Sequence, residues 1–159
     1  MNNKSLAALL QNRHDLSWEK REVNESGNFV NYMKIFSYEH HDFGLSDDGV
    51  WRGEYSSKSV TNSDNFVAFL SLLELERADV LALLRVALTR KGLPEPVIRT
   101  FPFDEILYIA LKVSSHWREL AIKWLDSGYP ISPEIAVEFP DLVHVVRWQK
   151  ARKEQIIDA

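Results

Sequence analysis

Cysteine is absent from this sequence of 159 residues, and glycine and proline occur only six times each. The lack of cysteine excludes disulfide bonds, thiolate nucleophiles and thiolate metal ligands, and it is compatible with a reducing compartment. The sequence also lacks any run of about 18 apolar residues, the length that a membrane-spanning helix needs. The apolar run near its N-terminus is shorter than the core of a signal peptide. We therefore expect a soluble, cytoplasmic protein without a membrane partner.

The sequence motifs of the common enzyme classes are also missing. There is no G-x-S-x-G nucleophile elbow, no phosphate-binding loop, no G-x-G-x-x-G fingerprint and no H-E-x-x-H zinc motif. We therefore expect no catalytic residue and no cofactor. Acid–base pairs can be assembled from distant positions, so an enzyme with an unrecognised active site stays open as an alternative.

Strong helix signals begin at about residue 62. Apolar residues recur at helical spacing, Ser63 and Ser132 stand where N-caps are favoured, and Gly92 and Gly128 are suited to end helices. Trp124 lies on one apolar stripe, so we expect it to be buried. The pattern predicts helices over residues 4–12, 63–75, 79–91, 104–113, 114–127 and from 140 to about 157.

These signals predict a mainly α fold made of antiparallel helix pairs. We expect a single helical domain over residues 1–159, with a less regular part (1–61) and a helix-pair part (62–159). The helix over 79–91 has little polar face, so we expect it to be central and buried. The segment 28–38 fits a helix better than a strand. The glycine-rich segment 40–57 fits an irregular loop or a short β element.

Two stretches of the sequence are similar at an offset of 36 residues. The turn Gly92-Leu93-Pro94 matches Gly128-Tyr129-Pro130, and the offset also places Leu70 on Ile106. A period of this length is typical of helical-repeat proteins. Two similar helical hairpins in an ordinary bundle explain the likeness equally well.

The net charge of −4 is concentrated in one segment. Residues 37–57 contain five acidic residues against the single Arg52, so the remainder of the chain is electrically balanced. A negative patch accelerates capture of a basic partner, and tryptophan is a frequent interface anchor. We therefore predict that this segment contacts a basic protein partner through Asp42, Asp47, Asp48, Trp51 and Glu54.

Other polar clusters are weaker candidates for a site. His40, His41 and Asp42 include metal-ligand types, but adjacent side chains in an extended loop point apart, so we expect no bound metal. His116 and His144 lie on predicted helices without a catalytic neighbour. The last helix is basic, yet cations are common near helix C-termini and face water. We expect no nucleic-acid partner for its residues Arg147, Lys150, Arg152 and Lys153.

The stretch SSHWRELAIKWLDSGYPISPEI (residues 114–135) resembles helical segments of the immunity proteins of bacterial polymorphic-toxin and contact-dependent-inhibition systems. The resemblance implies a cytoplasmic inhibitor that binds and neutralises one toxin domain, often a nuclease with a basic substrate groove. We therefore predict a non-catalytic protein-binding domain, most consistent with an immunity protein. The alternatives are a helical-repeat adaptor or scaffold protein and an enzyme with an unrecognised site.

Overall fold

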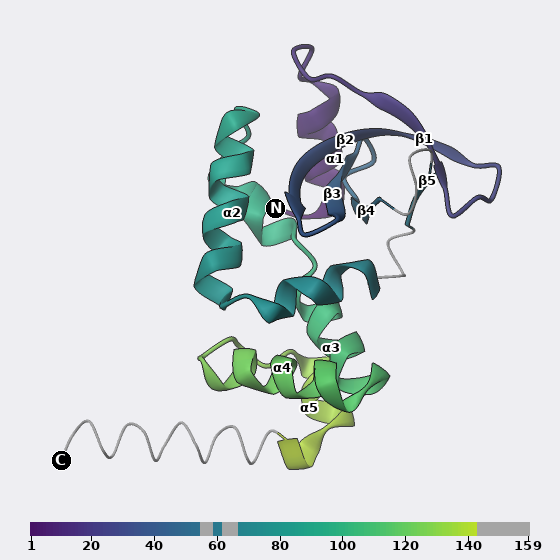
Figure 1. Cartoon of the computed structure of the whole chain (residues 1–159). Helices are drawn as coiled ribbons and strands as arrows, with labels where there is room; N and C mark the ends of the chain where they lie inside the picture. Colours follow the sequence, from purple (N-terminus) through teal and green to yellow (C-terminus); the bar gives the residue numbers. More distant parts are fainter. Residues whose placement is uncertain (55–58, 62–66, 143–159) are drawn as a thin grey trace. The chain divides into compact units, whose positions relative to one another are not determined.

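The computed structural model describes residues 1–54, 59–61 and 67–142, which are coloured in Figure 1. The chain divides into two compact units, unit 1 (Met1–Pro102) and unit 2 (Phe103–Ala159). Unit 1 includes residues on both sides of position 61, where the sequence suggested a change from a less regular part to a helix-pair part.

Unit 1 is built on a five-stranded mixed sheet, so the expected mainly α fold of helix pairs is wrong. The strands follow the order β4-β3-β2-β1-β5 across the sheet. β1 pairs with β5 in parallel, and the other neighbouring strands are antiparallel. The strands are β1 (Glu19–Val23), β2 (Phe29–Tyr38), β3 (His41–Ser46), β4 (Trp51–Gly53) and β5 (Ser59–Val60).

The sheet is curled, and its two edge strands meet (Figure 1). The backbone N–H of Thr61, directly after β5, donates to the carbonyl of Gly53 in β4 over 2.7 Å. An isolated antiparallel bridge joins Glu54 to Val60. Edge strands carry unpaired backbone groups, and this contact satisfies some of them. It also fixes the position of Glu54 at the junction of the two edges.

The segment 28–38, for which a helix was favoured, contains the long strand β2. Its register against β3 shifts between Lys34 and Phe36, so Ile35 is an extra residue, a β-bulge. A bulge moves the alternation of side chains by one residue. Phe36 therefore lies on the core face with Met33, and Tyr32 is buried on the opposite face. Together these three buried positions have a spacing that a helix would also produce. The bulge explains why the apolar pattern favoured the wrong structure.

The segment 40–57 forms two strands and a turn over its described residues, which extend to Glu54. Asp47 and Asp48 lie in the turn between β3 and β4, and Gly49 follows with φ +79°. A Cβ atom at Gly49 would lie 2.2 Å from the carbonyl oxygen of Asn3. Helix α1 (Asn3–Gln11) therefore packs directly against this turn, and only glycine fits there.

Among the described residues of unit 1, four helical elements accompany the sheet. Helix α1 confirms the helix expected over residues 4–12, and Asn2 caps it through a capping box with Ser5. The helix expected over 63–75 is a 3-10 helix over its described residues, and its expected cap Ser63 lies outside them. The other three elements are η1 (Val67–Glu74), α2 (Arg77–Arg90) and η2 (Glu95–Thr100).

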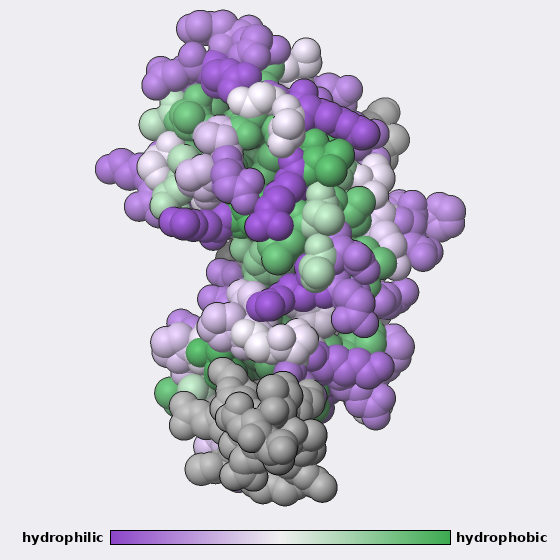
Figure 2. All heavy atoms as spheres, turned by 90° about the vertical axis from the view of Figure 1, so that its left-hand side faces the viewer, coloured by the Kyte–Doolittle hydropathy of each residue, from purple (hydrophilic) through white to green (hydrophobic). Residues whose placement is uncertain are grey.

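Helix α2 was expected to be central and buried, and it is an outer helix instead. One side of it packs against η2 and β2. On the opposite side, the exposed fractions of Leu83 and Val86 are 37% and 52%. Figure 2 views the side of unit 1 that carries α2, where hydrophobic residues lie among charged ones. The scarcity of polar residues on α2 therefore reflects an apolar outer surface and not burial.

Aromatic side chains from the sheet and the 3-10 helices form the core of unit 1. Phe43 stacks on Phe36 with ring centroids 5.0 Å apart and meets Phe69 of η1 at 4.8 Å. Phe101 lies edge-on to Trp51 with centroids 4.9 Å apart. Ring pairs of this geometry add to the stabilisation that burial of their area provides. These contacts place the aromatic core on one face of the sheet.

Unit 2 contains α3 (Phe103–Val113), α4 (Ser115–Asp126) and α5 (Pro133–Glu138). The hydroxyls of Ser114 and Ser132 accept hydrogen bonds from the backbone N–H groups of Trp117 and Ile135, the third residue of each following helix, as N-caps do. These caps confirm the predicted helix starts. The exposed fraction of Trp124 is 4%, which confirms its expected burial.

The 36-residue similarity does not correspond to a repeated structure. α3 packs against α4, whereas α2 packs against η2 and β2. The segment that the offset matches to α3 is the 3-10 helix η1. A solenoid needs copies of one unit that stack on each other. What the two stretches share is a helix ending in a left-handed glycine, Gly92 with φ +66° and Gly128 with φ +104°.

Several predictions fall outside the described residues, which end at residue 142. They are the helix from 140 to about 157 beyond its first residues, His144, and the basic set Arg147, Lys150, Arg152 and Lys153. In the part of the chain that the structure describes, no helix has both the length and the apolar character needed to cross a membrane.

Candidate functional site

Side-chain alternation gives the sheet a polar face opposite the aromatic core. On β3, Phe43 faces the core, so Asp42 lies on the other side. Glu54 is brought opposite Asp42 because its backbone N–H donates to the Asp42 carbonyl over 2.8 Å. The polar face, as defined here by strand register, carries Glu19, Arg21, Tyr32, Lys34, Asp42 and Glu54.

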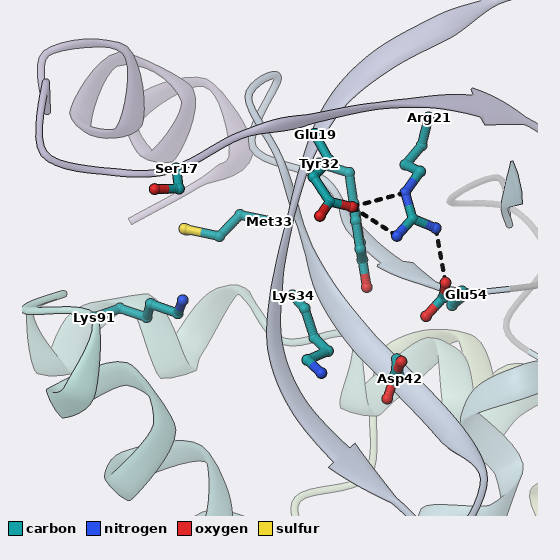
Figure 3. Close-up of a pocket in the computed structure, with 9 residues that line it drawn as sticks. All are labelled: Ser17, Glu19, Arg21, Tyr32, Met33, Lys34, Asp42, Glu54 and Lys91. Carbon is teal, nitrogen blue, oxygen red and sulfur yellow. Dashed lines mark hydrogen bonds and ion pairs between the residues drawn. The ribbon is translucent and has the colours of Figure 1, made fainter. Parts of the chain in front are cut away.

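A pocket of about 310 Å³ opens on the polar face (Figure 3). Its acidic end is lined by three carboxylates, those of Glu19, Asp42 and Glu54, with Arg21 and Tyr32 among them. In Figure 3, the side chain of Lys34 projects into the middle of the pocket. The opposite end is lined by Ser17, Met33 and Lys91. The volume is at the lower limit of pockets that bind small ligands, so the pocket suits a group the size of one side chain.

Arg21 is shared between two carboxylates at the acidic end. Its Nη1 lies 2.7 Å from Oε1 of Glu54, and its Nη2 lies 2.7 Å from Oε2 of Glu19. The exposed fractions of the Arg21 and Glu54 side chains are 16% and 20%, so this pair is largely shielded from water. One cation thus meets two carboxylates, and its charge is already balanced within the pocket.

Asp42 lies beside Glu54, and its pKa is shifted from the ordinary value. A hydrogen bond with Glu54 and one donated by the Ser37 hydroxyl hold the pKa of Asp42 below its ordinary value, with a smaller contribution from the charge of Lys34. Two neighbouring carboxylates repel each other. A cation that enters between Asp42 and Glu54 would therefore relieve this repulsion.

Tyr32 ends in a buried hydroxyl that has no hydrogen-bond partner among the described residues. Only 2% of the residue is exposed. In Figure 3 its side chain passes Glu19 and its hydroxyl points toward the space near Glu54 and Asp42. Burial raises the pKa of Tyr32, and the charges of Glu54 and Asp42 raise it further. Within the described residues, a polar group without a partner is therefore buried at the acidic end.

The other predicted partner-contacting residues lie apart from this pocket. Trp51 is a core residue, 3% exposed, and its Nε1 donates to Oγ1 of Thr100 over 2.9 Å. It is therefore not an exposed anchor. Asp47 accepts a hydrogen bond from Nδ2 of Asn31 over 2.9 Å and lines a second pocket beside α1. Asp48 pairs with Arg52.

Arg52 is a buried residue near the β3–β4 turn, and its guanidinium group makes several polar contacts. Its exposed fraction is 6%. Its Nε donates to Oγ of Ser46 over 2.8 Å, its Nη1 to the carbonyl of Thr61 over 3.3 Å, and its Nη2 to Oδ2 of Asp48 over 3.1 Å. The acidic segment is thus partly neutralised within the fold, and Asp48 has a structural partner. Of the five predicted residues, Asp42 and Glu54 line the pocket on the polar face together.

The histidines form no metal-binding cluster in the part of the chain that the structure describes. No group of three or more potential ligands (His, Cys, Asp or Glu) is close enough to hold a metal ion among those residues. His40 and His41 are exposed, whereas Asp42 lines the pocket on the polar face. His116 is exposed beside the ring of Trp117, with centroids 4.8 Å apart.

Comparisons with protein-family models, with curated proteins and with solved structures find no match to this chain. The geometry of the pocket is therefore the basis for a functional interpretation. Tyr32, Arg21 and Lys34 were not singled out from the sequence. Reading residues 30–38 as a strand would have placed Tyr32 and Lys34 on one face, but nothing local in the sequence predicts that Asp42 and Glu54 are their neighbours.

Proposed function

We propose that this chain is a non-catalytic protein-binding domain, of the kind that the resemblance to bacterial immunity proteins implies, and that it acts in the cytoplasm. The polar pocket of unit 1 is the part of the interface that we assign. The observation that carries the proposal is the juxtaposition of Asp42 and Glu54, both predicted to contact a partner, with the buried, unpartnered hydroxyl of Tyr32.

The hydroxyl of Tyr32 supports a binding role because no described residue satisfies it. A buried polar group without a partner costs about 1–3 kcal/mol, and such groups are uncommon in native proteins. Departures from good packing and pairing are expected at functional sites, where a partner completes them. A group inserted from another protein would supply the missing hydrogen bond in a desolvated setting, as the anchor residues of protein interfaces do.

The two alternative functions have less support. The prediction of a helical-repeat adaptor depended on the 36-residue repeat. The repeat is not a structural one, because α2 and η1 do not form a helix pair like α3 and α4. An enzyme would need a group suited to proton transfer near neutral pH. The pKa of Asp42 is shifted downward, which keeps its carboxyl group ionised and makes it a poor general acid. Binding of a basic group from a protein partner, in contrast, needs an ionised carboxylate, which Asp42 provides.

The proposal is tested by partner capture with two matched charge reversals. The intact chain is used as bait in extracts of the source cells, and captured proteins are compared between wild type, Asp42→Lys and Glu119→Lys. Glu119 is an exposed carboxylate on α4, outside the pocket. We expect at least one protein that wild type and Glu119→Lys retain and Asp42→Lys loses, and we expect co-expression of the chain to protect cells from that protein.

Circular dichroism and thermal unfolding confirm that each bait is folded. A partner that Asp42→Lys retains and Glu119→Lys loses would overturn the assignment of the pocket and move the interface to unit 2. The absence of any captured protein that distinguishes wild type from Asp42→Lys would overturn the proposal as a whole.

A further inference from the structure

We infer that the acidic end of the pocket receives a basic side chain, a lysine or an arginine of the partner, between Asp42 and Glu54 and against the hydroxyl of Tyr32. This inference rests on the proposed function and names the chemistry of the group that enters. Three features of the pocket carry it: the position of Tyr32, the balance of charge around its hydroxyl, and the size of the pocket.

The Tyr32 ring contacts two neighbouring strands. A Cβ atom at Gly44 would lie 2.7 Å from Cζ of Tyr32, so the ring rests directly on the glycine. The guanidinium carbon of Arg21 lies 5.7 Å from the ring centroid. A ring held in this way cannot turn its hydroxyl toward water without repacking. The hydroxyl oxygen has almost no exposed surface and no hydrogen-bond partner among the described residues, so an N–H donor that enters the pocket reaches its lone pairs by displacing the atoms that cover it.

The charges nearest the hydroxyl favour a cation. Glu54, Asp42 and Glu19 raise the pKa of Tyr32 and Arg21 lowers it, so the local potential is negative. Arg21 is already paired with Glu19 and Glu54. Glu54 has an ion pair with Arg21, whereas Asp42 has no ion pair within 4 Å among the described residues. An ammonium or guanidinium group that enters the pocket would supply that missing pair.

Two lysines of the pocket oppose a cation and limit where it binds. Lys34 lies close enough to Asp42 to lower the pKa of that residue, and Lys91 lies at the opposite end with Ser17 and Met33 (Figure 3). The cationic group must therefore lie at the Tyr32 end. The backbone of the partner's residue extends toward Lys91, so that its carbonyl oxygens lie near the positive charge of the Lys91 side chain.

The size of the pocket agrees with a single side chain. About 310 Å³ is small for a cofactor or a nucleotide, since ligand pockets range from about 300 to 1,000 Å³. A lysine or arginine side chain has an apolar stem that can lie along Met33 and a charged tip that reaches Asp42. One inserted side chain thus fits within the pocket and would meet the Tyr32 oxygen and the carboxylates together.

The inference is tested with blocked amino acids on the intact, isotope-labelled chain by NMR titration. The probes are N-acetyl-lysine N-methylamide and N-acetyl-arginine N-methylamide. N-acetyl-norleucine N-methylamide provides an uncharged control, and inorganic phosphate provides an anionic one. We expect saturable shifts of Tyr32, Asp42 and Glu54 with at least one basic probe, with affinity at least tenfold above that of the norleucine probe. The stronger of the two basic probes identifies the residue type.

Variants separate a cation site from an anion site. We expect Asp42→Asn and Tyr32→Phe each to weaken the basic probe at least threefold, and Lys34→Gln to strengthen it, because a like charge is removed. Glu119→Gln, outside the pocket, is the matched control and leaves the affinity unchanged. Saturable binding of phosphate that Lys34→Gln weakens would overturn the inference, and so would basic probes that bind no better than the norleucine probe.

The two proposals fail in distinguishable ways. If a captured partner depends on Asp42 but the basic probes neither bind the pocket nor compete with that partner, the protein-binding function stands and the basic side chain is wrong. If the probes bind the pocket but no captured protein depends on Asp42, the cation site is real and the protein-binding function is wrong.

Discussion

Gly44 of β3 lies directly under the ring of Tyr32 on β2. A Cβ atom at position 44 would lie 2.2 Å from the Met33 carbonyl oxygen and 2.7 Å from Cζ of the Tyr32 ring. Both distances are shorter than van der Waals contact allows, and the nearer atom belongs to the backbone of the neighbouring strand. Glycine at this position therefore allows the Tyr32 ring to lie flat across β3 and to carry its hydroxyl to the acidic end of the pocket.

Gly44→Ala is expected to destabilise the protein by about 1–3 kcal/mol, the usual cost of forcing an extra carbon into a packed site. The added methyl group must displace either the Tyr32 ring or the strand pairing of β2 with β3. Denaturant unfolding measures the loss. Gly27→Ala is an informative comparison, because its Cβ atom meets no atom within 4 Å and its strain arises from φ +82° alone. A Gly44→Ala variant as stable as wild type would contradict the described contact.

Tyr32→Phe is expected to leave the free energy of unfolding unchanged or to raise it by up to about 1 kcal/mol. The substitution removes a buried hydroxyl that has no partner among the described residues, and with it the cost of desolvating that group. The ring and its contact with Gly44 are kept. Chemical denaturation of both proteins provides the measurement. A loss of more than about 1 kcal/mol would show that the hydroxyl has a stabilising partner in the folded chain.

Arg52→Met is expected to lower the free energy of unfolding by about 3 kcal/mol. The buried guanidinium binds Ser46, Thr61 and Asp48, and its removal leaves polar atoms of these residues without a hydrogen-bond donor. Arg85→Met is the matched surface variant. Arg85 pairs with Glu95, and their side chains are 56% and 66% exposed, so we expect a loss below about 1 kcal/mol. Equal losses in the two variants, measured by urea unfolding, would contradict the structural role of Arg52.

Low pH is expected to weaken the contact between the segment that follows α1 and the C-terminal end of α2. Arg13 pairs with Asp15 at 2.6 Å and also donates to the carbonyls of Gly92 and Lys91. Its hydrogen bond lowers the pKa of Asp15 to about 2. Because the folded pKa lies below the unfolded value of about 3.9, this contribution is present above about pH 4 and is lost as the pH falls through about 2.

We expect Asp15→Asn to flatten the pH dependence of stability between about pH 4 and 2. The Asp15 side chain is 65% exposed, so salt should screen the pair and reduce the difference between variant and wild type. Thermal unfolding at a series of pH values and at two salt concentrations provides the measurement. Parallel profiles for the two proteins at low salt would show that the pair does not form in solution.

The parts of the fold that the sequence predicted correctly depend on residues near one another in the chain. The N-caps Ser114 and Ser132 act within one turn of helix, and Trp124 is buried because it falls on an apolar stripe with a period of 3.6 residues. The same local patterns could not decide the fold class. The apolar spacing around Tyr32 fits a helix as well as a bulged strand, and the bulge is defined only by pairing with β3.

The sequence by itself determined the helix starts of unit 2 and the concentration of charge in residues 37–57. Only the tertiary structure decided which of those charges act together. Strand pairing brings Asp42 beside Glu54 and both to Arg21, buries Trp51 in the aromatic core and pairs Asp48 with Arg52. These outcomes depend on contacts between residues up to 49 positions apart. The energy of such contacts comes from packing and desolvation in the folded chain, which no local sequence pattern contains.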